Sequence, residues 1–163
     1  MKFHEHIIRV KMPNQSGPSR DALWLGIVEF AHHPECFYGE IASSEAFAEH
    51  VTEAGVCEFV RRVRFHAGNL SFEERVTLDE AGGIYRSFFS GDDLRPASDF
   101  TMKLEEPEQG SLFVRFIYNE QPCAEVDGDA RAALFAALRR QAYEAKDQQI
   151  IDAILKSSQF SEL

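Results

Sequence analysis

Two charged side chains stand on strand faces that are otherwise apolar. Arg61 lies two residues after Phe59, and Glu74 lies two residues after Phe72, so each charge shares a face with its aromatic neighbour. A short turn between the two predicted strands would place the guanidinium beside the carboxylate. Such a pair is either a mutually satisfied buried ion pair or a site that gives one partner to a polar group of a ligand, because buried charges are costly unless paired. We predict all four residues as ligand-binding candidates and Glu74 also as a catalytic candidate.

Aromatic side chains on the later strands add a second kind of chemistry. Tyr118 lies on an apolar strand, where its phenol could bond a bound carbonyl or act as a general acid. Phe100 offers a flat surface for stacking against a polycyclic molecule. Core packing is the alternative explanation for both. We predict Phe100 as a ligand-binding residue and Tyr118 as a ligand-binding residue and second catalytic candidate.

Metal, cofactor and nucleotide sites are not predicted. His4 and His6 share a strand face, but no third ligand follows at a recognisable spacing. The three cysteines form no CxxC pair, which argues against both a zinc cluster and a disulfide framework. No GxSxG elbow or glycine-rich phosphate loop occurs either. We therefore expect no metal and no cofactor.

Composition and charge narrow the class of partner. The chain has 163 residues, 44% of them apolar, which suits one domain spanning residues 1–163. Its formal charge of -10 repels phosphate backbones and anionic lipid surfaces. No signal peptide or apolar span is readable at the start. We expect a cytoplasmic protein that binds neither nucleic acid nor membrane.

The elements that must position these residues follow a clear order. A strand at residues 3–11 precedes a helix at residues 20–32, which Ser19 could cap, and a second short helix at residues 33–39. Alternating apolar residues between positions 43 and 121 predict six antiparallel strands in a meander. Residues 129–156, with a cap at residues 127–129, contain no Gly or Pro and predict one long helix. The fold class is α+β, with a curved sheet of about seven strands and a long C-terminal helix packed across it.

The long helix also predicts a cavity. Steps of three and four place Leu138, Gln141 and Ala145 on the face that we expect to meet the sheet. The middle of this stripe is small and polar, which leaves space and hydrogen-bonding groups where a closed core would carry large apolar residues. We predict these three residues as ligand-binding.

Five segments of the chain carry a family resemblance. They are Leu23-Trp24-Leu25-Gly26, His33-Pro34-Glu35-Cys36-Phe37, Val60-Arg61-Arg62-Val63-Arg64-Phe65, Phe72-Glu73-Glu74-Arg75-Val76 and Gln141-Ala142-Tyr143-Glu144-Ala145-Lys146-Asp147. With these segments the chain resembles the START-like (SRPBCC) helix-grip superfamily, and within it the AtaL-like group of bacterial and fungal domains of unknown function. The resemblance implies a helix-grip fold that cages lipids, polyketides or other hydrophobic ligands, and it implies a cyclase or hydrolase in some members.

Three functions follow from these observations. The first is binding of a small hydrophobic or aromatic molecule, lipid-like or polyketide-like, between the sheet and the last helix. The alternative is a polyketide cyclase-like or hydrolase-like enzyme, in which Glu74 or Tyr118 moves protons and Arg61 stabilises an enolate-like charge. The third is a scaffold protein with a filled core. Apolar residues at Phe113 and Ile117 could also form a homodimer patch.

Overall fold

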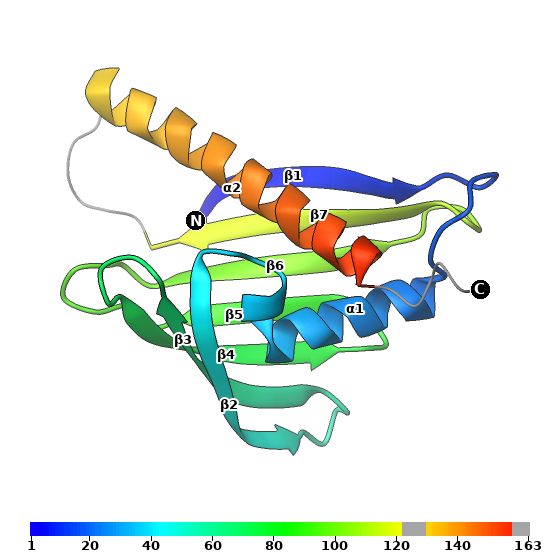
Figure 1. Ribbon diagram of the computed structural model, residues 1–163, viewed down its shortest axis with the longest axis horizontal. Coiled ribbons are helices and arrows are strands. Elements are labelled where there is room, and N and C mark those ends of the chain that lie inside the picture. The colour runs from blue at the N-terminus through cyan, green and yellow to red at the C-terminus, as the bar shows by residue number, and fades with distance from the viewer. Residues whose placement is uncertain (122–129, 158–163) are drawn as a thin grey trace.

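The computed structural model describes residues 1–121 and 130–157. A seven-stranded antiparallel sheet with the order β1-β7-β6-β5-β4-β3-β2 carries both helices on one face (Figure 1). The elements are β1 (Lys2–Lys11), α1 (Arg20–His32), a 3-10 turn η1 (Pro34–Cys36), β2 (Ile41–Val51), β3 (Cys57–Phe65), β4 (Ser71–Asp79), β5 (Ile84–Phe89), β6 (Ser98–Glu105), β7 (Leu112–Glu120) and α2 (Ala130–Lys156). The predicted fold class, a helix-grip arrangement of a sheet and a long C-terminal helix, is confirmed.

The meander from β2 to β7 pairs each strand with the next one in the chain, as the alternation predicted. In the β3–β4 hairpin Arg61 lies directly opposite Glu74. The alternation of side chains along β2 breaks at Ala48, which has a positive φ of 58°. At this position the pairing with β3 shifts register between Phe47 and His50. This bulge bends the edge strand without changing the register of the hairpin behind it.

The helical pair after β1 is only partly as predicted. Helix α1 begins after Ser19, whose hydroxyl accepts a hydrogen bond of 3.1 Å from the backbone N–H of Ala22. The second helix is a single 3-10 turn, in which the backbone N–H groups of Cys36 and Phe37 each donate to the carbonyl three residues earlier. The side chain of Phe37, directly after this turn, is buried.

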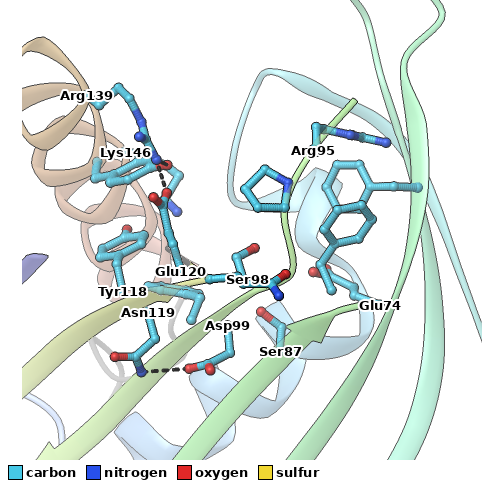
Figure 2. A pocket seen from close by; sticks show the side chains of 16 residues that line it. Glu74, Ser87, Arg95, Ser98, Asp99, Tyr118, Asn119, Glu120, Arg139 and Lys146 are labelled. Carbon is cyan, nitrogen blue, oxygen red and sulfur yellow. Dashed lines mark hydrogen bonds and ion pairs between the residues drawn. The ribbon is translucent and has the colours of Figure 1, made fainter. Parts of the chain in front are cut away.

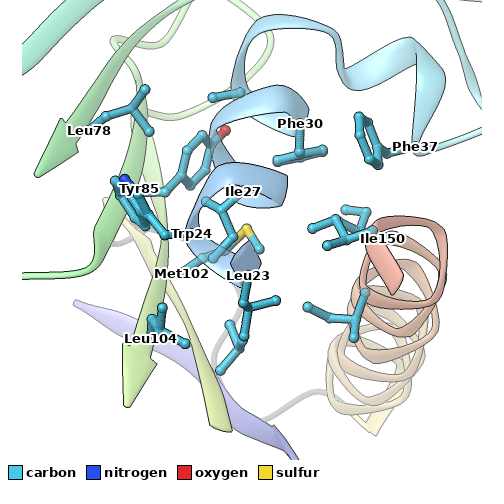
Figure 3. Packing of buried hydrophobic residues seen from close by; sticks show 14 of the residues in the cluster. Leu23, Trp24, Ile27, Phe30, Phe37, Leu78, Tyr85, Met102, Leu104 and Ile150 are labelled. Atoms are coloured by element: carbon cyan, nitrogen blue, oxygen red, sulfur yellow. The ribbon is translucent and has the colours of Figure 1, made fainter. Parts of the chain in front are cut away.

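The core lies between the sheet and the two helices (Figure 3). Leu23 and Ile27 of α1 are fully buried, and they pack in one cluster with Ile150 of α2 and with Tyr85 and Met102 of the sheet. The helices approach each other at Gly26 and Ile154. A Cβ atom at Gly26 would lie 2.5 Å from Cγ2 of Ile154, so this contact requires glycine.

The predicted inward face of α2 is wrong. The side chain of Leu138 is 49% exposed, and Gln141 and Ala145 are exposed as well. The face toward the sheet contains two charged residues, Lys146 and Asp147. A prediction from the spacing of apolar residues places charged residues on the solvent side, because charges are rarely buried. The buried and half-buried residues that form this face in the C-terminal half of α2 are Tyr143, Lys146, Asp147, Ile150, Ile151 and Ile154.

Two further predictions can be compared with the structure only in part. The predicted cap of the long helix, residues 127–129, lies outside the described residues, as does Cys123. Within the described part of the chain, neither helix combines the length and the apolar character needed to cross a membrane.

Candidate functional site

A cavity with two adjoining lobes lies between the sheet and α2. The large lobe has a volume of about 530 Å³, and the small lobe, toward α1 and η1, has about 340 Å³. Figure 2 shows Lys146 and Arg139 reaching into the large lobe from α2, while Glu74 and Ser87 line it from the strands. The residues that line both lobes are Phe72, Glu74, Ser87, Phe100, Tyr143 and Lys146. These shared residues make the two lobes parts of one site.

The predicted contact between Arg61 and Glu74 is confirmed, and it belongs to a larger network. Nε of Arg61 donates to Oε1 of Glu74 at 3.0 Å, and Nη2 donates to the same oxygen and, at 2.7 Å, to the hydroxyl of Tyr85. Nη1 donates to the carbonyl oxygen of Ala31 at 2.8 Å, in the last turn of α1. Burial alone lowers the pKa of Arg61, but Tyr85 and Glu74 outweigh it and raise this pKa overall. The guanidinium is 4% exposed, and most of its donors are used inside the protein.

Tyr118 belongs to a second buried network, which the sequence analysis did not find. Its hydroxyl donates to the carboxylate of Asp147, at 2.8 Å from Oδ1 and 2.7 Å from Oδ2. Nε2 of His6 lies 2.7 Å from Oδ2 of the same fully buried carboxylate. Burial, and then the negative charge of Asp147, raise the pKa of Tyr118 well above its ordinary value. The phenol proton therefore points at Asp147, so that the geometry does not favour Tyr118 as a general acid.

Lys146 is the other cavity residue that the sequence analysis missed. Its ammonium nitrogen lies 4.3 Å from the ring centroid of Phe100, 4.9 Å from that of Tyr118 and 5.4 Å from that of Tyr143. The side chain is 22% exposed, and removal of the ammonium from water lowers its pKa. The only signal in the sequence was indirect, since both Lys146 and Asp147 lie in the helix segment that carries the family resemblance.

The structure brings together five of the predicted ligand-binding residues. Phe72, Glu74 and Phe100 line both lobes, Tyr118 lines the large lobe, and Arg61 lines the small lobe. Their part in ligand binding stays a prediction.

The other predicted residues do not line either lobe. Phe59 is 1% exposed and packs in the core, with its ring stacked on His32 at a centroid distance of 4.5 Å. Leu138, Gln141 and Ala145 lie on the exposed side of α2, for the reason given above.

The histidines of β1 bond carboxylates of α2, and the described cysteines are free thiols. Nε2 of His4 lies 2.7 Å from Oε2 of Glu144, so each histidine of β1 bonds a carboxylate of α2. Among residues 1–121 and 130–157, no three His, Cys, Asp or Glu side chains are grouped so that they could hold a metal ion. Cys36 is exposed and Cys57 is half-buried, and both are free thiols.

Phe113 and Ile117 of β7 are half-buried, and the dimer patch stays a prediction.

Comparison with known proteins gives the family. Residues 13–159 match the family model described as acetylaranotin biosynthesis cluster protein L, AtaL. The chain belongs to the AtaL family. This assignment agrees with the resemblance found in the sequence and with the helix-grip fold. A search of curated proteins finds no match to this AtaL-family chain.

Solved structures share the fold of this AtaL-family protein at low sequence identity. The protein TTHA0849 from Thermus thermophilus has a TM-score of 0.62 and 14% identity, over 95% of this chain and 99% of that one. The Zhui aromatase/cyclase from a Streptomyces species has a TM-score of 0.58 and 13% identity, over 94% and 91%. Norcoclaurine synthase from Thalictrum flavum has a TM-score of 0.56 and 15% identity, over 94% and 86%. At these identities the likeness shows the fold alone.

Proposed function

We propose that this protein binds a small hydrophobic molecule with aromatic or conjugated character, lipid-like or polyketide-like, in the two-lobed cavity. The observation that carries this proposal is the wall shared by the two lobes, where the rings of Phe72, Phe100 and Tyr143 surround a few polar groups. Ligand sites in proteins are typically concave and largely apolar, with few polar groups that orient the ligand, and they measure about 300–1,000 Å³. The large lobe alone, at about 530 Å³, falls within that range.

The relatives support the same class of ligand. The family is described by a protein of the acetylaranotin biosynthesis cluster, and two structural neighbours are named as an aromatase/cyclase and as norcoclaurine synthase. The name aromatase/cyclase refers to the formation of aromatic rings, and related folds bind small hydrophobic ligands, which agrees with the class of ligand proposed for the cavity.

Binding has more support than catalysis. The enzyme alternative needs Arg61 to stabilise a developing charge, yet its guanidinium already donates to Glu74, Tyr85 and Ala31. It also needs Glu74 or Tyr118 to move protons, and the proton of Tyr118 is directed at a buried carboxylate. Glu74 stays the better candidate for proton transfer, because it lines both lobes. A filled core, the third alternative, is disfavoured by the volume of the cavity.

Blocking each lobe tests the proposal. Ala142 lines the small lobe and Ser98 lines the large lobe, and neither belongs to the core cluster, so Ala142→Trp and Ser98→Trp each add bulk to one lobe. Phenylnaphthylamine, an uncharged dye that fluoresces when bound in apolar sites, serves as the probe. We expect at least one of the two variants to weaken dye binding by roughly tenfold, a loss of about 1.4 kcal/mol.

Ala145→Trp is the matched control, since Ala145 lies on the same helix but lines neither lobe. Its dye affinity should stay within about twofold of the wild-type value. Binding that is absent in the wild-type protein, or equal in all three variants, would contradict a ligand site between the sheet and α2. Native mass spectrometry of gently purified protein then identifies any molecule that remains bound.

A further inference from the structure

The carboxylates that line the cavity or adjoin it already have donors within the protein. The partners are Arg61 for Glu74, Arg86 and Asn119 for Asp99, Arg139 for Glu120, and Tyr118 and His6 for Asp147. The remaining arginine of the large lobe, Arg95, is bonded through two of its nitrogens to Asp92. Among the described residues of the cavity wall, every arginine and every carboxylate is thus engaged.

Lys146 differs from these arginines. The carboxylate oxygen recorded nearest to its ammonium is Oδ1 of Asp147, at 3.7 Å, which is longer than a hydrogen bond. The single phenol proton of Tyr118 is shared between both oxygens of that carboxylate, and one of these oxygens also lies 2.7 Å from Nε2 of His6. The ammonium has three donors, and the rings of Phe100, Tyr118 and Tyr143 attract its charge without accepting conventional hydrogen bonds.

The position of this ammonium suits a ligand. Lys146 lines both lobes, so a molecule in either lobe can reach it. Its cost of burial is only partly offset, because the ammonium loses hydration and its ion pair with Asp147 is long, at 3.7 Å. An anionic oxygen from a ligand would supply that counter-ion, while the ligand's ring packs on the aromatic side chains beside it.

We propose that Lys146 is the anchor for an anionic oxygen of the ligand, so that the natural ligand is an aromatic or conjugated molecule that carries a carboxylate or an acidic phenol or enol. This inference rests on the proposed function and specifies its ligand class. It also moves the polar anchor from Arg61, which donates to Glu74 and Ala31 at 3.0 Å or less, to a residue of α2 whose nearest carboxylate oxygen lies at 3.7 Å.

A pair of dyes tests the inference directly. Anilinonaphthalene sulfonate carries one anionic group, and phenylnaphthylamine has the same ring system without it. Lys146→Met should weaken binding of the anionic dye by roughly tenfold or more, the usual effect of losing a hydrogen-bonded charge, and should leave the affinity for the neutral dye within about twofold. Lys146→Arg, which keeps the charge, should retain most of the affinity for the anionic dye.

Lys103→Met is the matched control. Lys103 is exposed on β6 between the buried residues Met102 and Leu104, so it lies on the opposite face of the sheet and its loss changes the net charge equally. Neither dye should bind differently to this variant. Circular dichroism and thermal melting of each variant establish that the binding measurements concern folded protein.

A competition experiment on the wild-type protein tests the inference without any substitution. Naphthoate and naphthamide, an acid and its neutral amide of similar size, compete for bound phenylnaphthylamine. Stronger displacement of phenylnaphthylamine by naphthoate than by naphthamide supports the inference. Equal displacement by the two compounds overturns the inference, as does equal weakening of both dyes in Lys146→Met, and in either case the proposed function stands. If neither dye binds the wild-type protein, the proposed function fails as well.

Discussion

Replacing Arg61 with alanine should cost far more stability than any surface change on the same strand. The substitution removes four hydrogen bonds to three acceptors, namely the carboxylate of Glu74, the hydroxyl of Tyr85 and the carbonyl of Ala31. Tyr85 is fully buried, and the side chain of Glu74 is only 11% exposed, so water cannot replace the lost donors well. Breaking a buried ion pair in this way costs about 3–5 kcal/mol. For a chain of this size, that corresponds to a fall in melting temperature of roughly 6–20 °C.

The neighbouring pair on the same two strands is the control. Arg62 lies opposite Glu73, one residue further along the register, and both side chains are about half exposed. Arg62→Ala should therefore lower the free energy of unfolding by about 0–1 kcal/mol. Urea unfolding, followed by circular dichroism and by the fluorescence of Trp24, the single and buried tryptophan, measures both variants.

Three measurements on these variants test whether the buried network stabilises the fold. If Arg61→Ala costs no more than Arg62→Ala, the buried network does not stabilise the fold. The double variant Arg61→Met with Glu74→Leu should recover part of the loss, because it leaves no unpaired charge behind. At a temperature where Arg61→Ala is folded, binding of phenylnaphthylamine within about twofold of wild type would show that the network serves the fold rather than the ligand.

Two further predictions concern the helix contact and the buried tyrosine. Gly26→Ala should destabilise the protein by about 1–3 kcal/mol in thermal melts, because its Cβ would collide with Ile154, while Gly39→Ala, which meets no atom within 4 Å, should change stability little. A melting temperature of Gly26→Ala equal to that of Gly39→Ala would contradict the close helix contact. The pKa of Tyr118 is raised in the folded state, so the folded protein holds this proton more tightly than the unfolded chain, and the stability gained is lost as pH rises above about 10. Tyr118→Phe should flatten this alkaline decline in urea unfolding, and an unchanged slope would count against the Tyr118–Asp147 contact.

The sequence was sufficient to predict the sheet, because alternation along a strand assigns each side chain to one of two faces. Arg61 and Glu74 could be placed together for this reason, since a short hairpin fixes their register. The face of α2 was harder to predict. A helix places a residue every 100° around its axis, so an error of one position rotates the predicted stripe out of the interface, as happened at Leu138 and Ala145.

The buried charges of α2 explain why that error arose. Asp147 lies on the face toward the sheet because His6 of β1 and Tyr118 of β7 bond its carboxylate, and Lys146 beside it packs against the ring of Tyr118. The contact between His6 and Asp147 joins residues 141 positions apart, and no local pattern in the sequence reports it. The predicted second helix is a single turn with 3-10 hydrogen bonds, a form that the presence of Pro34 at its start does not distinguish from the first turn of an α-helix.

The strand order has a consequence for how the chain is made. Strand β1 is synthesised first, yet its partner is β7, so that Glu5 and its ion-pair partner Arg115 lie 110 residues apart. The meander from β2 to β7 can pair progressively as it leaves the ribosome, whereas β1 must wait, and pairing over such distances is slow. Helix α2 comes last and joins β1 through His4 and His6. The cavity therefore closes only when the two ends of this sequence meet, and a chain that stops before α2 would present an open, apolar sheet to the cell's quality-control machinery.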